Sequence, residues 1–244
     1  MRKVEIVETA KWDLNEPILI EGFPGIGLVG TISASFIAEK LKMELLGYIA
    51  SPRFPPIAAV HNYVPLHPAR LYKSRKHNLV VLFSEFVVPL SVVYDLSCAI
   101  LEWSKKRKIK QIISVGGIGI KGEQEEVFGI ASLPKLTEKL ESAGVKLIKE
   151  GATTGVSGVL LAECASQKFP AVSLLAEAKP DILDPRGAAL VLEAVKSFAK
   201  LPLKTEELVE EAENIETKIQ EIMENAKVAG EAYKKTDKLN AMYG

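Results

Sequence analysis

Short apolar runs rich in Val and Ile alternate along the chain with longer segments of helical period. The short runs predict strands at 17–22, 45–51, 57–63, 78–86, 111–117, 145–151 and 171–178. The longer segments predict helices at 28–42, 90–108, 133–143, 157–168 and 185–200. This alternation predicts an α/β fold over residues 1–200, a three-layer sandwich around a mainly parallel, buried sheet. Because no helix separates 45–51 from 57–63, we expect part of the sheet to be antiparallel.

The pattern changes after Lys200, where the strand signal ends and Pro202 separates a new segment from the preceding helix. Thr205 is placed to cap a helix that begins there. The apolar positions of this helix are spaced by 4, 3, 4, 3 and 4 residues: Leu208, Ala212, Ile215, Ile219, Ile222 and Ala226. The spacing predicts a C-terminal helix over 201–228 with a narrow apolar seam of the coiled-coil type. Two interpretations stay open, since the seam can pack on the chain's own domain or join copies in an oligomer.

Residues 229–244 are polar and have no apolar period, which predicts a flexible tail. The tail nevertheless ends on Met242, Tyr243 and Gly244. A terminal carboxylate can pair with a lysine, a tyrosine offers both a ring and a hydroxyl, and the preceding apolar side chain can fill a groove. These three residues are the candidate partner-binding residues.

The charges of the chain balance, with 31 Lys and Arg residues against 31 Asp and Glu residues. Without an excess of basic charge, we expect neither nucleic acid nor an anionic membrane as a partner. The first residues contain no apolar core of the signal-peptide type, and the apolar runs are too short to span a bilayer, so we expect a cytoplasmic protein. Cys98 and Cys164 lie among apolar and small residues and are expected to pack as core thiols.

A glycine motif, "EGFPGIGLVG", follows the first predicted strand and opens a helix. Gly25, Gly27 and Gly30 match G-x-G-x-x-G, which in this setting can bind a dinucleotide. Such a site also needs an acidic residue at the end of the next strand, and "LLGYIAS" runs into "SPRFPP" without one. We therefore favour a tight strand-to-helix turn and expect no cofactor. An anion-binding turn at these glycines is the alternative.

Other catalytic patterns are incomplete. Ser157 follows Gly155, but residue 159 is Val, so the nucleophile elbow is absent and Ser157 is interpreted as a helix-start residue. A second glycine-rich stretch, 115–131, carries three clustered carboxylates that are interpreted as a solvated edge: Glu123, Glu125 and Glu126. The histidines lack the spacing of a metal pair, so we expect no metal site: His61, His67 and His77. We expect no catalytic residues.

Three stretches of the body, "IEGFPGIGLVG", "VGGIGIKGE" and "GATTGVSGVLL", resemble the archaeal proteasome-assembly-chaperone family. The resemblance covers most of residues 1–200 and is greatest for members with a long C-terminal extension. It implies a phosphorylase- or hydrolase-like α/β body, no established catalytic activity, and self-association. The chain end matches the hydrophobic-tyrosine-any motif with which proteasome activators dock between neighbouring α subunits of the 20S particle. By that motif, Met242 is the hydrophobic element, Tyr243 acts on the gate and Gly244 supplies the carboxylate.

The leading hypothesis is therefore an ATP-independent proteasome activator or assembly chaperone. It would be a homo-oligomer, with a tetramer as the first expectation, and would present several tails to the 20S α subunits. Unfolded proteins are a further expected partner class. The alternative is a phosphorylase- or hydrolase-like enzyme that uses the glycine turns at 25–30 and 116–122 as an anion-binding crevice, with Gly25, Gly27 and Gly30 in the first turn. A third interpretation is a structural oligomer in which the tail has no role.

Overall fold

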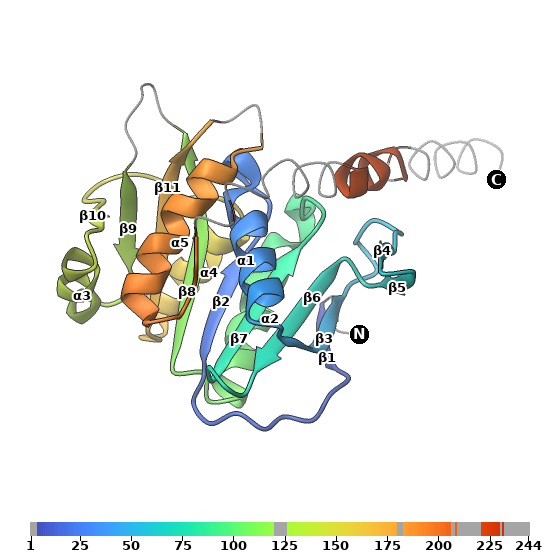
Figure 1. The fold of residues 1–244 in the computed structure, drawn as a ribbon, viewed down its shortest axis with the longest axis horizontal. Coiled ribbons are helices and arrows are strands. Elements are labelled where there is room, and N and C mark those ends of the chain that lie inside the picture. The colour runs from blue at the N-terminus through green and yellow to red at the C-terminus, as the bar shows by residue number, and fades with distance from the viewer. Residues whose placement is uncertain are drawn as a thin grey trace.

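The computed structural model describes residues 4–119, 126–179, 183–205, 208, 221–229 and 231. Within them, a nine-stranded mixed sheet runs in the order β1-β3-β6-β7-β2-β8-β11-β9-β10, with helices on both faces (Figure 1). Its strands are β1 (Glu5–Glu8), β2 (Ile18–Gly22), β3 (Glu44–Ala50), β6 (Ala69–Ser74), β7 (Leu79–Ser84), β8 (Gln111–Gly119), β9 (Val127–Ala131), β10 (Lys146–Leu147) and β11 (Ala171–Ala178). The α-helices are α1 (Val29–Lys40), α2 (Leu90–Lys106), α3 (Thr137–Ser142), α4 (Gly155–Ser166) and α5 (Pro185–Ala199), with 3-10 turns at Ile26–Leu28 and Pro134–Leu136.

The centre of the sheet is parallel, as the sequence predicts. Strand β2 pairs in parallel with β7 and β8, and β8 pairs in parallel with β11. The flanks include antiparallel pairs: β3 is antiparallel to both β1 and β6, and β11 is antiparallel to β9. The predicted α/β fold with a mixed sheet is confirmed.

The segment 57–63, predicted as one strand, does not join this sheet. Its residues Ala59–His61 form β4, which pairs only with β5 (Val64–Leu66) in a separate hairpin. The antiparallel neighbours of β3 are β1 and β6 instead, and in the second pair Glu44 lies opposite Lys73. The hydrophobic pattern does not predict β6, because this buried strand carries the charged residues Arg70 and Lys73. Their charges are satisfied by partners from other segments.

Two cores lie on opposite faces of the sheet. Successive residues of a strand point to opposite sides, and on β2 Ile20 packs into the core with α1 and α5, while Leu19 packs into the core with α2 and α4. Both side chains are completely buried. The continuous apolar runs of the central strands are thus explained by two helix layers.

The C-terminal seam packs on the body at both of its described ends. Leu208 is completely buried in the core of α1 and α5, and Ala226 is buried in the core of α2 and α4. Ile222 is half-buried. Three seam residues and the predicted partner-binding residues lie outside the described residues: Ala212, Ile215, Ile219, Met242, Tyr243 and Gly244. Their roles stay predictions.

The Thr205 hydroxyl donates to the Glu193 carboxylate of α5. Because residues 206 and 207 lie outside the described residues, its role as a helix cap stays a prediction. Within the described ranges, none of the helices combines the length and the apolar character that a membrane crossing requires.

Helix α5 begins with a side-chain cap. The Asp184 carboxylate accepts a hydrogen bond from the Gly187 amide at 2.9 Å, and Pro185 occupies the first helical position. The second carboxylate oxygen accepts from the Lys179 amide at 3.0 Å. One side chain therefore holds both the helix start and the segment before it.

We expect Asp184→Ala to lower the free energy of unfolding by about 1–2 kcal/mol, because it leaves the Gly187 amide without its acceptor. Asp184→Asn keeps a side-chain oxygen and should lose less than half as much. Urea unfolding followed by circular dichroism measures both values. Equal stability of the alanine variant and the wild type would contradict the capping role.

Candidate functional site

The glycine turn between β2 and α1 lies at the carboxyl end of the parallel strands, where α/β sheets usually bind ligands. Gly27 has φ 61°, and a Cβ on it would come within 2.9 Å of the Asp184 Cβ. A Cβ on Gly30 would lie 2.6 Å from the Val115 carbonyl oxygen. These two glycines therefore permit close backbone packing and a left-handed turn. A Cβ on Gly25, in contrast, would meet nothing within 4 Å.

The second glycine stretch packs against the first. A Cβ on Gly117 of β8 would lie 2.3 Å from the carbonyl oxygen of Ile26, inside the turn. Residues 120–125, including Glu123 and Glu125, lie outside the described residues. Glu126 pairs with Lys146, and its amide donates to Glu177 at 3.1 Å. The two glycine turns are thus one packed junction.

A buried carboxyl group that the sequence analysis did not single out lies next to this junction. Glu21 is the penultimate residue of β2 and lies directly opposite Ser114 of β8, which in turn lies opposite Ser173 of β11. The Ser157 hydroxyl of α4 donates to Glu21 Oε2 at 3.2 Å. Glu21 is completely buried, and Ser114 and Ser173 are 1% exposed. Four polar side chains from three strands and one helix therefore meet inside the core of α2 and α4.

This serine–glutamate cluster (Glu21, Ser114, Ser157, Ser173) is only partly hydrogen-bonded. Glu21 Oε1 and the hydroxyl oxygens of Ser114 and Ser173 are buried without a hydrogen-bond partner among the described residues. Burial raises the pKa of Glu21 to about 7, against the opposing effect of the neighbouring serine hydroxyls. The side chain can thus hold a proton at neutral pH.

Ser157 is the third residue of α4, close to the predicted helix start, but its contact with Glu21 was missed. The available signal was one carboxylate in the otherwise apolar run "PILIEG". Its serine neighbours come from two strands and one helix that are distant in sequence, so only the folded structure brings them together. Because Glu21 is fully enclosed, the cluster is a feature of the core and not a cleft open to substrate.

The three histidines have separate surroundings. His61 Nε2 lies 3.0 Å from Glu85, whose carboxylate also accepts from the buried guanidinium of Arg70 at 2.7 and 2.9 Å. Burial alone would raise the pKa of Glu85, but the bonds from His61 and Arg70 outweigh it and hold the pKa below its usual value. His67 stacks on Tyr48 with ring centroids 3.7 Å apart.

His77 lies in the turn before β7, where its backbone amide donates to a serine hydroxyl. No group of three His, Cys, Asp or Glu side chains placed to hold a metal occurs in the part of the chain that the structure describes.

Cys164 packs in the core, as predicted. It is completely buried in α4, and burial, with the nearby Glu21 charge as a smaller cause, raises its pKa to about 12. Cys98 of α2 is half-buried, and its pKa is also raised, chiefly by burial. Both thiols are therefore protonated at neutral pH, which is the form that reacts slowly.

Comparison with known proteins identifies the family to which this fold belongs. A sequence profile of the PAC2 family matches residues 19–223. An uncharacterised protein of Methanocaldococcus jannaschii is 34% identical over 221 residues, which is 91% of each chain. The crystal structure of Pyrococcus furiosus PbaA, described as an archaeal homologue of proteasome-assembly chaperone, is 34% identical with a TM-score of 0.83 and covers 94% of this chain and 99% of its own.

A second Pyrococcus furiosus structure, PbaB, is described as an archaeal proteasome activator. It is 26% identical with a TM-score of 0.77 and covers 91% of this chain and 99% of its own. These matches confirm the family and the α/β fold. The long C-terminal extension of this chain predicts the greatest similarity to the homologue B of the family, PbaB. Sequence identity and TM-score are, however, both higher for PbaA than for PbaB.

Glu21→Gln should change how stability depends on pH. The pKa of Glu21 is about 7 in the folded protein against 4.5 when unperturbed, so the folded state binds the proton more tightly. The contribution of Glu21 to the stability of the wild type is then greatest below the unperturbed pKa of 4.5 and is lost as pH rises towards the folded-state pKa of about 7. Because glutamine does not titrate, the stability of the variant relative to wild type should rise by about 2–3 kcal/mol from pH 5 to pH 8.

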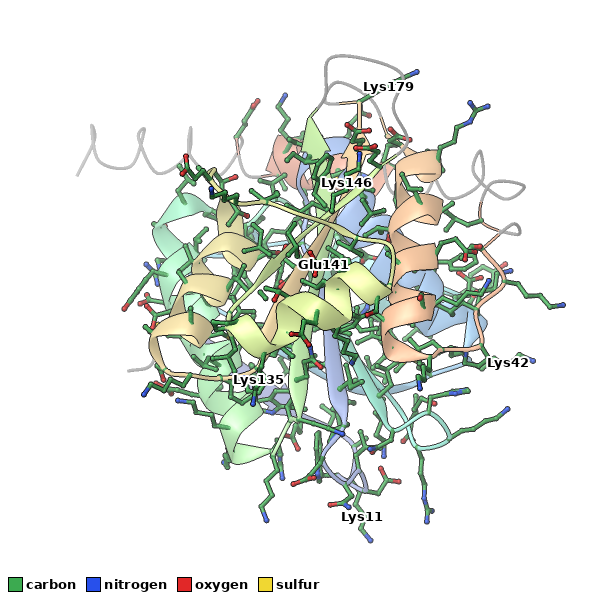
Figure 2. The ribbon with its side chains drawn as sticks, turned by 90° about the vertical axis from the view of Figure 1, so that its left-hand side faces the viewer. Lys11, Lys42, Lys135, Glu141, Lys146 and Lys179 are labelled. Carbon is green, nitrogen blue, oxygen red and sulfur yellow. The ribbon has the colours of Figure 1, made fainter. Side chains whose placement is uncertain are left out.

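Denaturant unfolding at the two pH values measures this difference. Glu141→Gln is the matched control, since Glu141 projects from α3 into solvent (Figure 2), and its stability relative to wild type should not change with pH. A constant difference for Glu21→Gln as well would show that Glu21 is ionised in the folded protein across this range.

Proposed function

Because the chain belongs to the PAC2 family, we propose that it is a proteasome-assembly-chaperone homologue that activates the 20S proteasome without ATP. The observation that carries this proposal is the chain end, Met242-Tyr243-Gly244. The description of the related PbaB as an archaeal proteasome activator supports it. The three residues would dock in the pockets between neighbouring α subunits and favour an open gate.

Each terminal residue has a chemically distinct part in this docking. The carboxylate of Gly244 pairs with a lysine of the pocket, the Tyr243 ring packs while its hydroxyl forms a hydrogen bond, and Met242 fills an adjoining apolar groove. Fifteen residues follow Ala229, the last residue of the described helical stretch 221–229. Fully extended, that length reaches about 50 Å, which lets a body outside the ring deliver its tail.

A single tail buries too little surface for tight binding, so the proposal includes a homo-oligomer. Once one tail is bound, the others act at a raised effective concentration, and avidity can exceed the affinity of one tail by about 100-fold or more. The body then serves as a scaffold that holds several tails at a fixed spacing.

The packed glycine junction and the enclosed serine–glutamate cluster favour this binding role over the enzyme alternative. Gly27 and Gly30 have contacts that explain them without a bound anion, and Glu21 is closed to solvent. The junction is thus explained by packing within the body, and the cluster lies in its core.

Deletion of residues 242–244 should reduce stimulation of peptide hydrolysis by purified archaeal 20S proteasome to the rate of the proteasome alone. Tyr243→Ala should have nearly the same effect, because it removes both the ring and the hydroxyl. Tyr233→Ala, a tyrosine change in the same tail, is the matched control and should keep full stimulation. Undiminished stimulation by the deletion variant would show that the tail is not the docking element.

Stimulation should also be the same with and without ATP and magnesium, because the proposed step uses only binding energy. Calorimetry with ATP and with inorganic phosphate tests the enzyme alternative directly, and we expect no saturable heat. Saturable binding that Gly27→Ala abolishes, with Asp184→Asn as a nearby control for folding, would support an anion site at the glycine turn instead.

A further inference from the structure

Helices α1, α2, α4 and α5 all end at the same edge of the sheet. The first three lead into β3, β8 and β11, and α5 returns along the sheet after β11. Because β2, β7, β8 and β11 are parallel, we call the edge at which these strands begin the amino edge. Helix α3 runs the other way, since it leads into β10, which is parallel to β9 and therefore opposite in direction to β11. The opposite edge thus receives the end of α3.

Each of the four helix ends at the amino edge has a lysine in the left-handed backbone region, a position that usually holds glycine. The lysine stands in the turn that closes its helix, where the next amide donates to a carbonyl five residues earlier, as from Met43 to Ala38 at 2.9 Å. The same bond closes the other three helices: Ile109 to Ser104, Phe169 to Cys164 and Leu201 to Lys196. We call the four residues the edge lysines: Lys42 with φ 47°, and Lys108, Lys168 and Lys200 with φ 55°.

Helix α3 ends in the same kind of turn, but with glycine at the left-handed position. Gly144 has φ 78°, and the Val145 amide donates to the Leu140 carbonyl at 3.1 Å. A lysine at positive φ is strained, whereas a glycine is not. The attraction between a cation and a helix C-terminus does not explain the difference, because it would act on α3 as well. The strained residue type is therefore kept at one edge only, which points to a use for the lysine side chains.

Basic residues dominate the connections at the amino edge. Five stretches there hold 12 Lys and Arg residues and one carboxylate, Glu39: "EKLKM" (39–43), "RKHN" (75–78), "KKRKIK" (105–110), "SQKFP" (166–170) and "KSFAKL" (196–201). Asp13 and Glu44, which are also near this edge, lie 2.9 and 3.4 Å from the Lys73 ammonium. Figure 2 shows Lys42 in its lower half and Lys179, from the opposite edge, in its upper half. The amino edge thus has a positive excess.

Lysines from three different segments are close enough to affect one another. The Lys139 ammonium of α3 lies 4.0 Å from the centre of the Phe198 ring of α5. Burial lowers the pKa of Lys139, and the charges of Lys110 and Lys200 lower it further. None of these three ammonium groups has an ion-pair partner in the part of the chain that the structure describes. On the other face of the sheet, the Lys105 ammonium donates to Gln167 at 2.5 Å and joins the ends of α2 and α4. An added anion would relieve the repulsion among these lysines.

We propose that the amino edge binds a linear chain of phosphate groups, of the kind found in inorganic polyphosphate and in the backbone of nucleic acids. Lysine binds phosphate as a point charge, so recognition depends on the number of charges. From β3 to β11 the edge spans five strand intervals, or about 24 Å, which suits an extended polyanion. The exposed large hydrophobic side chains of the described residues all lie outside the five stretches. The described part of this edge therefore offers no apolar anchor for a peptide and no exposed ring on which a base could stack.

The balanced net charge of the whole chain does not reveal this edge. Residues 201–244 hold 10 Asp and Glu against 6 Lys and Arg, so residues 1–200 carry the corresponding positive excess. The expectation of no polyanionic partner was based on the total, whereas local clustering determines binding to a polyanion. ATP and orthophosphate carry too few charges to bridge edge lysines on different helices, so neither should bind saturably. Binding at the amino edge does not involve the chain end and is tested separately from the proposed function.

Fluorescence anisotropy of labelled inorganic polyphosphate with the full-length chain tests the proposal. We expect saturable binding that weakens as salt rises, because bound phosphates release counterions. The variant with Lys42→Gly, Lys108→Gly, Lys168→Gly and Lys200→Gly should bind about 100-fold more weakly, and the slope of log K against log salt concentration should decrease in magnitude by about 3. Glycine suits the left-handed turn, so the melting temperature of this variant should not fall.

The matched control changes the four edge lysines to arginine, which keeps the charge at each position and should bind as wild type does. A second variant, Lys110→Gln with Lys139→Gln, alters no left-handed residue and should weaken binding by about tenfold. Single-stranded RNA and polyglutamate serve as competitors. Polyglutamate of equal charge should not displace the polyphosphate.

Three outcomes would overturn the proposal: no saturable binding of polyphosphate by wild type, a glycine variant with the wild-type affinity and salt slope, or polyglutamate that competes as well as polyphosphate itself. If the glycine variant does not fold, wild-type affinity of the Lys110→Gln, Lys139→Gln variant has the same meaning. Displacement by RNA supports a phosphate backbone as the common ligand, and failure of RNA to displace the probe supports the inorganic chain alone.

Discussion

The close approach of the β2–α1 turn to strand β8 is the contact on which the rest of the body depends. A side chain at Gly30 or Gly117 would collide with backbone oxygen atoms of the opposing segment, so only glycine lets the turn lie against the sheet. The Asp184 amide then donates to the Gly27 carbonyl at 2.9 Å, which places the start of α5 beside the start of α1. In other folds the G-x-G-x-x-G motif surrounds a phosphate. In this protein it allows two helices and three strands to pack closely together.

The part of the fold that follows from local pattern was predictable. The central parallel strands and all five main-body helices lie where hydrophobic period places them, because buried strands and amphipathic helices carry their signal in adjacent residues. Strand β6 was missed because its buried Arg70 and Lys73 obtain partners from other segments. The serine–glutamate cluster was missed for a related reason, since its members come from four elements and only the strand register aligns them. The chain-end motif consists of three consecutive residues outside the described part of the chain, so its role stays a prediction.

The two ends of the molecule differ in their surfaces. The side with α3, β9 and β10 presents charged side chains such as Lys135, Glu141 and Lys146 (Figure 2), as expected of a solvated surface. The other end carries the β4–β5 hairpin and the described helical stretch 221–229 (Figure 1). In the account proposed here, the tails of the chain engage the proteasome. The Asp184 cap and the Arg70–Glu85 ion pair hold segments of the body together.

Electron cryomicroscopy of the complex between the full-length chain and an archaeal 20S proteasome tests this account most directly. The account predicts density for Met242, Tyr243 and Gly244 in the pockets between neighbouring α subunits, with the terminal carboxylate beside a lysine and the gate open. Density for the body on the α ring with these pockets empty would contradict it, and so would particles on which the protein contacts the proteasome only away from the α ring.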